Sequence, residues 1–83
     1  MERFIYTVTL RNDTQTKLYF WASRLLRYDE LVALREILKA RRNAIYDPDR
    51  RNAAIEDGFQ EFLRRTNVKL HVCLTPIFGG IEV

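Results

Sequence analysis

The chain has 83 residues, of which 47% are hydrophobic and 30% charged, and its net charge is +3. This length predicts one compact domain over residues 1–83, and the composition is that of a globular protein rather than a disordered one. No apolar run approaches the roughly 18 residues that a membrane span needs, and the first residues lack the pattern of a signal peptide. We therefore predict a cytoplasmic protein with no membrane partner.

The first predicted elements form a β-hairpin. Residues 3–11 alternate apolar and polar side chains with the period of a strand, residues 12–16 predict a polar turn, and residues 17–23 predict a second strand. The second strand is apolar on both faces, which indicates a central strand or one covered by a partner.

The period changes to that of a helix at about Asp29. The first helix is predicted to reach Ile45, and Asp47-Pro48 is predicted to end it and begin a second one, because Asp is a good N-cap and Pro suits the first helical position. The second helix runs to about Arg65, and Gly58 within it indicates a close approach between the helices. The apolar stripes of these helices predict buried positions at Leu31, Leu34, Ile37, Leu38, Ala44, Ile45, Ile55, Phe59, Phe62 and Leu63.

Residues 68–75 alternate again and predict a third strand. The tail, residues 76–83, is predicted either to form an edge strand or to stay flexible. The element order is therefore ββααβ, and the predicted fold is α+β, a three-stranded, mainly antiparallel sheet with two helices packed on one face. The face of the sheet under the helices is predicted to carry Phe4, Tyr6, Val8, Leu10, Leu18, Phe20, Val72 and Leu74.

Few side chains are available for catalysis or metal binding. Cys73 is the single cysteine, which excludes an internal disulfide, and His71 is the single histidine, which excludes the usual four-ligand zinc sites. These two share a strand face, but their spacing of about 6.5–7 Å is long for a nucleophile and its base. Asp47 and Asp49 resemble the start of a calcium loop, but Arg51 breaks the series. We predict a protein that is not an enzyme and has no catalytic residues, cofactor or metal.

Residues 41–51, RRNAIYDPDRR, which we call the elbow, place two arginine pairs around the predicted boundary between the helices. Arg41 and Arg42 are explained by the negative C-terminal end of the first helix. Arg50 and Arg51 fall at the positive start of the second helix, with no acid three or four residues further on. Such a pair suits an anionic partner, either phosphate or an acidic protein surface, although a solvated hinge explains it as well.

The face of the sheet away from the helices is the second candidate surface. It is predicted to carry Ile5, Tyr19, Trp21 and His71, bordered by Arg3, Lys17 and Lys69. Trp and Tyr are typical anchors of protein interfaces, and rings among basic side chains also stack on bases. Self-association or cover by the tail would bury the same residues.

We predict a small non-catalytic binding protein, of the inhibitor or adaptor type, that acts by occupying the surface of a macromolecular partner. Its size and lack of motifs are typical of proteins from phages and other mobile elements. A protein partner is predicted, contacted by Arg42, Arg50, Arg51, Tyr19, Trp21 and His71. A homodimer through the sheet face or an edge strand also agrees with these patterns.

The alternative is a nucleic-acid-binding module that uses the elbow. Arg35, Lys39 and Arg42 would then add a basic stripe along the first helix. Eleven of the fourteen basic residues are arginine, which suits phosphate recognition, but the chain also has eleven acidic residues. This balance weighs against a dedicated phosphate binder, which usually has a strongly basic domain or face.

Overall fold

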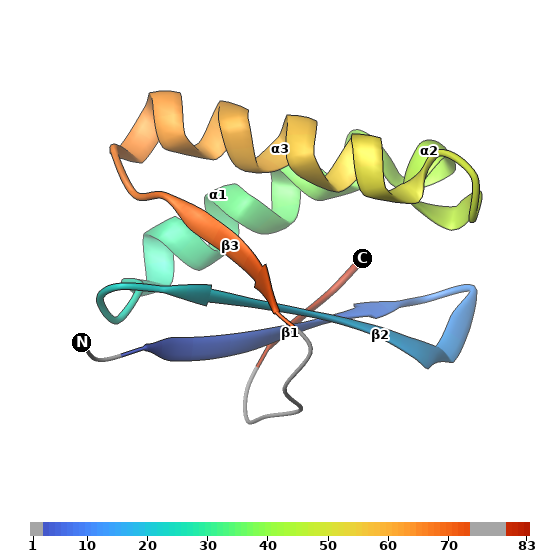
Figure 1. Ribbon diagram of the computed structural model, residues 1–83, viewed down its shortest axis with the longest axis horizontal. Helices are drawn as coiled ribbons and strands as arrows, with labels where there is room; N and C mark the ends of the chain where they lie inside the picture. Colours follow the sequence, from blue (N-terminus) through green and yellow to red (C-terminus); the bar gives the residue numbers. More distant parts are fainter. Residues whose placement is uncertain (1–2, 74–79) are drawn as a thin grey trace.

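The computed structural model describes residues 3–73 and 80–83, and within these residues three helices pack on one face of a four-stranded sheet (Figure 1). The strands are β1 (Phe4–Leu10), β2 (Asp13–Ala22), β3 (Leu70–Cys73) and β4 (Gly80–Glu82), and the helices are α1 (Tyr28–Lys39), α2 (Arg42–Tyr46) and α3 (Arg51–Thr66). The predicted α+β class is confirmed. The predicted count of three strands and two helices is wrong, because a fourth strand and a third helix are present.

The fourth strand makes the sheet mixed rather than wholly antiparallel. The strand order is β3-β2-β1-β4, and β4 pairs in parallel with β1, with Ile81 opposite Val8. The pairing continues beyond β4, since the Val83 N–H donates to the Thr9 carbonyl (2.9 Å) and the Arg11 N–H donates to the Val83 carbonyl (2.7 Å). A parallel pair needs a long crossover. Here that crossover contains β2, β3 and all three helices.

The hairpin between β1 and β2 turns earlier than predicted. Leu10 pairs with Asp13, so the turn lies at residues 11–12, and the prediction of a turn over 12–16 is wrong. Thr9 pairs with Lys17, which leaves residues 14–16 as a bulge in β2. The Asp13 carboxylate stabilises this bulge because it accepts hydrogen bonds from the Gln15 N–H (3.1 Å) and the Thr16 hydroxyl. β2 lies between β3 and β1, which confirms the prediction of a central strand.

The predicted first helix is interrupted at Arg41. α1 ends at Lys39, and Arg41 has φ −110° and ψ 12°, outside the α-helical region. Its N–H donates to the Leu38 carbonyl (3.0 Å), three residues back, in a tight terminal turn. The apolar spacing continued across this turn, so Ile45 is fully buried even though it belongs to the separate helix α2.

The hydrophobic core lies between the helices and the sheet. Phe20 of β2 packs against Tyr6 and Phe59, with ring centroids 5.4 Å apart in both pairs. Of the predicted core, Val72 is 57% exposed, because β3 is an edge strand, and Leu74 lies outside the described residues. Predicted core residues that are half-buried instead are Phe4, Leu18, Leu31, Ala44 and Leu63. Those that are buried as predicted are Tyr6, Val8, Leu10, Phe20, Leu34, Ile37, Leu38, Ile45, Ile55, Phe59 and Phe62.

Gly58 marks the contact between α1 and α3. A Cβ at this position would lie 2.8 Å from Cδ2 of Leu38, which is fully buried. The close approach predicted at Gly58 is therefore confirmed, and a larger residue here would push against a side chain that has little room to move.

Candidate binding surfaces

The elbow is built around the short helix α2 rather than around a cap at Asp47. α3 begins at Arg51 with Arg50 as its N-cap residue, so the predicted helix start at Asp47-Pro48 is wrong. Asp47 instead follows α2, where its carboxylate accepts the Asp49 N–H (3.0 Å) and its carbonyl accepts the Arg50 N–H (3.0 Å). These bonds form a turn that delays the second helix by three residues.

Arg41 fastens the helices together. Its Nε donates to Asp57 of α3 (2.7 Å), one terminal nitrogen donates to Glu61 (2.6 Å) and the other to the Ile37 carbonyl (3.0 Å). The Arg41 side chain is 21% exposed, and Glu61 also pairs with Arg65 (2.7 Å). The bond from Arg41, together with its charge, lowers the pKa of Glu61. Arg41 is thus a structural residue, and the explanation by the helix dipole was incomplete.

Arg50 and Arg51, at the start of α3, differ in their surroundings. Arg51 is half-buried, and its guanidinium donates to the carbonyls of Ile45 (2.8 Å) and Tyr46 (3.4 Å), the last residues of α2. These carbonyls lack partners within so short a helix, so Arg51 is explained by the fold. Arg50 and Arg42 are exposed. These two arginines are what the elbow offers to an anionic partner.

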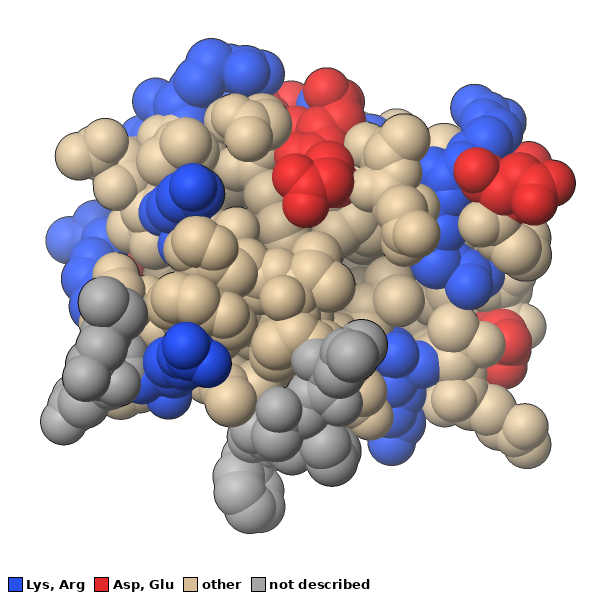
Figure 2. All heavy atoms as spheres, in the orientation of Figure 1, with Lys and Arg blue, Asp and Glu red and all other residues tan. Residues whose placement is uncertain are grey.

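The charges around the elbow do not form one basic surface. Figure 2 shows acidic and basic side chains interspersed around a broad uncharged centre. The predicted stripe of Arg35, Lys39 and Arg42 is divided by the break at Arg41, because Arg42 belongs to α2 and not to α1. This distribution provides little of the continuous positive potential that phosphate binding needs.

The second candidate, which we call the outer sheet face, points away from all three helices. Strand register places Ile5, Trp21 and His71 in one row and Tyr19 and Cys73 in the next, so Tyr19, Trp21 and His71 share one face as predicted. The arginines of the elbow lie in the helical layer (Figure 1). The structure therefore separates the predicted site residues into two surfaces on opposite sides of the sheet.

The centre of the outer sheet face is a stack of three side chains. The centroids of the His71 and Trp21 rings are 4.1 Å apart, and the two ring planes are inclined by 15°. The guanidinium carbon of Arg3 lies 4.8 Å from the centroid of the Trp21 ring. Because β2 lies between β1 and β3, these two neighbours approach the indole from opposite sides. Stacking and cation–π attraction hold Trp21 in a fixed orientation while it stays partly exposed.

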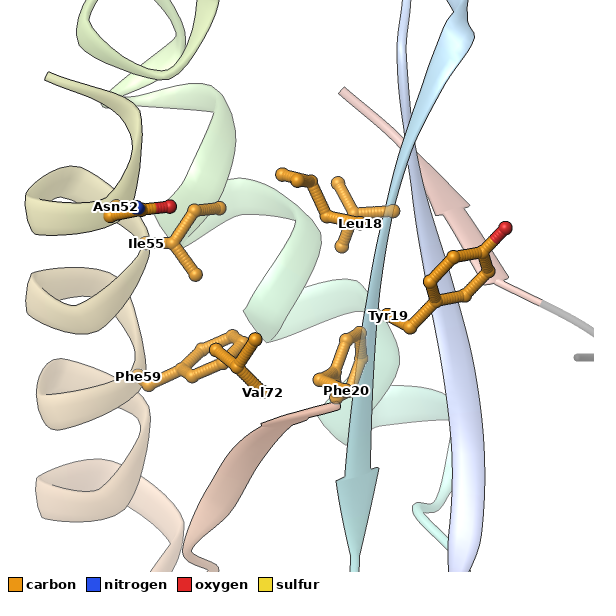
Figure 3. Close-up of a pocket in the computed structure, with 8 residues that line it drawn as sticks. Leu18, Tyr19, Phe20, Asn52, Ile55, Phe59 and Val72 are labelled. Carbon is orange, nitrogen blue, oxygen red and sulfur yellow. The ribbon is translucent and has the colours of Figure 1, made fainter. Parts of the chain in front are cut away.

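A small apolar opening lies between α3 and the β2–β3 edge (Figure 3). Ile55 and Phe59 of α3 face Leu18 and Phe20 of β2, and Val72 closes one side. The opening has a volume of about 30 Å³, which is space for a water molecule and not for a metabolite. Among the described residues, it lies at the margin of the core, beside the pairing of β2 with β3.

A third surface was missed by the sequence analysis. Leu31, Val32 and Arg35 of α1, together with Tyr28 at its start and Ile81 of β4, line a shallow hollow of about 190 Å³ that we call the α1–β4 groove. Tyr28 is 83% exposed and Val32 is 40% exposed. The sequence indicates the α1 side of this groove, since Tyr28 and Val32 lie one helical turn apart and outside the apolar stripe that faces the core. The other side is formed by Ile81 of β4, whose position next to α1 is not evident from the sequence.

Glu30 is a buried carboxylate with a structural role. It is 3% exposed, accepts two bonds from Arg24 (2.8 and 2.7 Å), and accepts the Arg27 N–H (2.9 Å) at the start of α1. The bond from Arg24, helped by that N–H, lowers the pKa of Glu30 to about 2, although burial acts in the opposite direction. An ionised carboxylate with these partners is a helix cap and not a proton donor.

Comparison with known proteins gives no information on the function of these surfaces. A scan against protein-family models matches no family, and neither the search of curated proteins nor that of solved structures returns a match. Within residues 3–73 and 80–83, no group of three or more His, Cys, Asp or Glu side chains could hold a metal ion. No helix in the same part of the chain is long and apolar enough to cross a membrane.

Proposed function

We propose that this protein is a non-catalytic binding domain that occupies the surface of a partner protein through its outer sheet face. The observation that carries the proposal is the stack of Arg3, Trp21 and His71 on a face that the described helices leave uncovered. Binding energy at protein interfaces concentrates in Trp, Tyr and Arg. A side chain that its neighbours already hold in place also loses little entropy when a partner arrives.

The same stack favours a protein over a nucleic acid. Binding of single strands depends on bases stacking on exposed aromatic faces. A base could stack on Trp21 only by displacing Arg3 or His71, since they contact the ring from its two sides. In the elbow, Arg41 and Arg51 are bonded within the chain. The nucleic-acid alternative therefore rests on Arg42 and Arg50.

Site-specific photocrosslinking tests the proposal. A photoreactive amino acid in place of Tyr19, on the outer sheet face, is expected to crosslink a protein in an extract of the source organism. The matched control carries the same group in place of Asn43, an exposed residue of the elbow. Trp21→Ala, combined with the probe at position 19, is expected to reduce the crosslink at least tenfold while the variant stays folded by circular dichroism.

Two outcomes would contradict the proposal. A crosslink of equal yield from positions 19 and 43 would show that the outer sheet face has no special role. Binding to mixed nucleic acids that falls steeply with salt, with a shallower slope for the double variant Arg42→Ala, Arg50→Ala, would favour the nucleic-acid alternative instead.

A further inference from the structure

The α1–β4 groove lies at the edge of the sheet, separate from the outer sheet face. We propose that it joins two copies of this chain about a two-fold axis. In this dimer β4 pairs antiparallel with β4 of the second copy, α1 packs beside the second α1, and the two sheets become one continuous sheet of eight strands. Three features of the groove lead to this occupant: the backbone of β4, the exposed residues of α1, and the position of Ile81 between them.

The backbone of β4 presents hydrogen-bonding groups at the edge. Val83 directs its N–H and its carbonyl towards β1, to Thr9 and Arg11. Successive residues of a strand direct these groups to alternate sides, so Gly80 and Glu82 direct theirs away from β1, where no other described strand lies. Such an edge is a template for another strand.

The three residues of β4 favour one pairing register. With the two-fold axis at Ile81, Gly80 lies opposite Glu82 of the second copy, and the outward groups of these residues form four hydrogen bonds. Ile81 then meets Ile81 of the second copy on the side of the helices, because its partner Val8 belongs to that side. An axis at Glu82 would instead place two carboxylates directly opposite each other, which is unfavourable.

The outward face of α1 carries charges of opposite sign towards its two ends, and Asp29 at the first end also lies 3.5 Å from Arg27 of its own chain. Tyr28, Val32, Arg35 and Lys39 follow one another at helical spacing, with Asp29 beside the first of them. A two-fold axis perpendicular to the sheet makes the two copies of α1 antiparallel, so their helix dipoles point in opposite directions. Asp29 of each copy then approaches Lys39 of the other. Val32 packs near the axis against the aliphatic stem of the opposite Arg35.

A single axis serves the strands and the helices together. Ile81 lines the same hollow as Tyr28, Val32 and Arg35, so it lies beside the first two thirds of α1 rather than beyond either end. An axis through Ile81 therefore passes between the ends of the helix pair. The outward face of α1 has an acid towards one end, bases towards the other and apolar residues between them. A second copy that runs antiparallel places its basic end opposite the acidic end of the first, so the same face can serve both partners of a two-fold dimer.

Sedimentation equilibrium of the purified chain tests the dimer. The wild type is expected to associate reversibly, and Val32→Glu is expected to raise the dissociation constant at least tenfold, because it places a charge near the axis. Val72→Glu is the matched control, since Val72 is an exposed valine on β3 at the opposite edge of the sheet. A wild type that stays monomeric up to millimolar concentration, or equal effects of the two substitutions, would overturn the proposal.

Charge reversal tests the orientation of the helices. Asp29→Lys and Lys39→Asp are each expected to weaken the homodimer, because each places like charges together. A mixture of the two variants is expected to form a heterodimer, in which both contacts are again between opposite charges. Failure of the mixture to associate more strongly than either variant would rule out the antiparallel arrangement. Photocrosslinking from position 19 should be unchanged in Val32→Glu, which separates this proposal from that for the outer sheet face.

Discussion

At the scale of single residues, several charged side chains stabilise the fold through partners that no sequence pattern identifies. Arg41 is bonded to Asp57 and Glu61, 16 and 20 residues away, and Arg51 to the carbonyl of Ile45 across a turn. The sequence shows an arginine cluster but not these partners, because they depend on the packing of the helices. Trp21 was predicted correctly as an outward-facing residue, since strand alternation alone decides its side of the sheet.

The first prediction concerns Glu30 and pH. Its pKa falls from 4.5 to about 2 on folding, so its contribution to stability is full above about pH 5 and is lost as the pH falls towards 2. Glu30→Gln should lower the free energy of unfolding by about 1–3 kcal/mol at pH 7. This difference from wild type should shrink as the pH falls. Urea unfolding between pH 7 and pH 3 measures it. Glu36→Gln, at an exposed position of α1, is the control, and a pH-independent effect of Glu30→Gln would contradict the assignment.

A second prediction separates the two arginines at the start of α3. Arg51→Ala should cost about 1–2 kcal/mol of stability, because the last carbonyls of α2 lose a charged donor. Arg50→Ala should change stability by less than about 0.5 kcal/mol, as expected for an exposed residue. Arg51→Lys keeps the charge but not the forked donor geometry, and should recover only part of the loss. Equal urea midpoints for the two alanine variants would show that Arg51 does not stabilise α2.

At the scale of elements, the apolar period predicts which residues of a helix are buried better than it predicts where the helix ends. Leu34, Leu38 and Ile45 keep helical spacing across the break at Arg41, so the sequence shows one helix where the structure has two. At the break, Arg41 is bonded to Asp57 and Glu61 of α3, and such contacts between distant residues do not appear in the apolar period. For β4 the sequence left two alternatives, an edge strand or a flexible tail, since three residues are too few to show alternation.

The packing of α1 on α3 gives the third prediction. Alanine favours a helix over glycine by about 1 kcal/mol, but a Cβ at position 58 would lie 2.8 Å from Cδ2 of Leu38. Gly58→Ala should therefore destabilise wild type by roughly 0.5–2 kcal/mol, since overpacking outweighs the gain in helix propensity. In a Leu38→Val background the same substitution should be neutral or stabilising, because the clashing methyl is removed.

A double-mutant cycle measures this coupling. The interaction between positions 58 and 38 should be at least about 0.5 kcal/mol. The same cycle with Leu34→Val is the control, because Leu34 is equally buried in α1 but is not among the nearest neighbours of a Cβ at position 58. If both cycles gave the same coupling, the contact at Leu38 would not explain the requirement for glycine.

At the scale of the whole molecule, the sheet has a long centre and short edges. β1 and β2 have 7 and 10 residues and lie inside the sheet, whereas β3 and β4 have 4 and 3 residues and lie at its edges. The apolar residues on both faces of the second strand predicted that β2 lies inside the sheet. The order of the strands followed from the crossover to β4, which no local pattern encodes. Both proposed binding surfaces depend on this order, because it places Trp21 in the middle and the free backbone of β4 at the rim.

The fourth prediction follows from this arrangement and uses amide hydrogen exchange. At low protein concentration, the amides of β1 and β2 that pair within the sheet should exchange most slowly, since they are released only when the core opens. Within the C-terminal segment, the Val83 amide should exchange more slowly than the Glu82 amide, because the first donates to the Thr9 carbonyl and the second points away from β1. Raising the concentration into the range of the dimer should slow Glu82 and leave the exposed edge of β3 unchanged. Protection of Glu82 at the lowest concentration would mean that the chain itself covers the edge, and the dimer could not form as proposed.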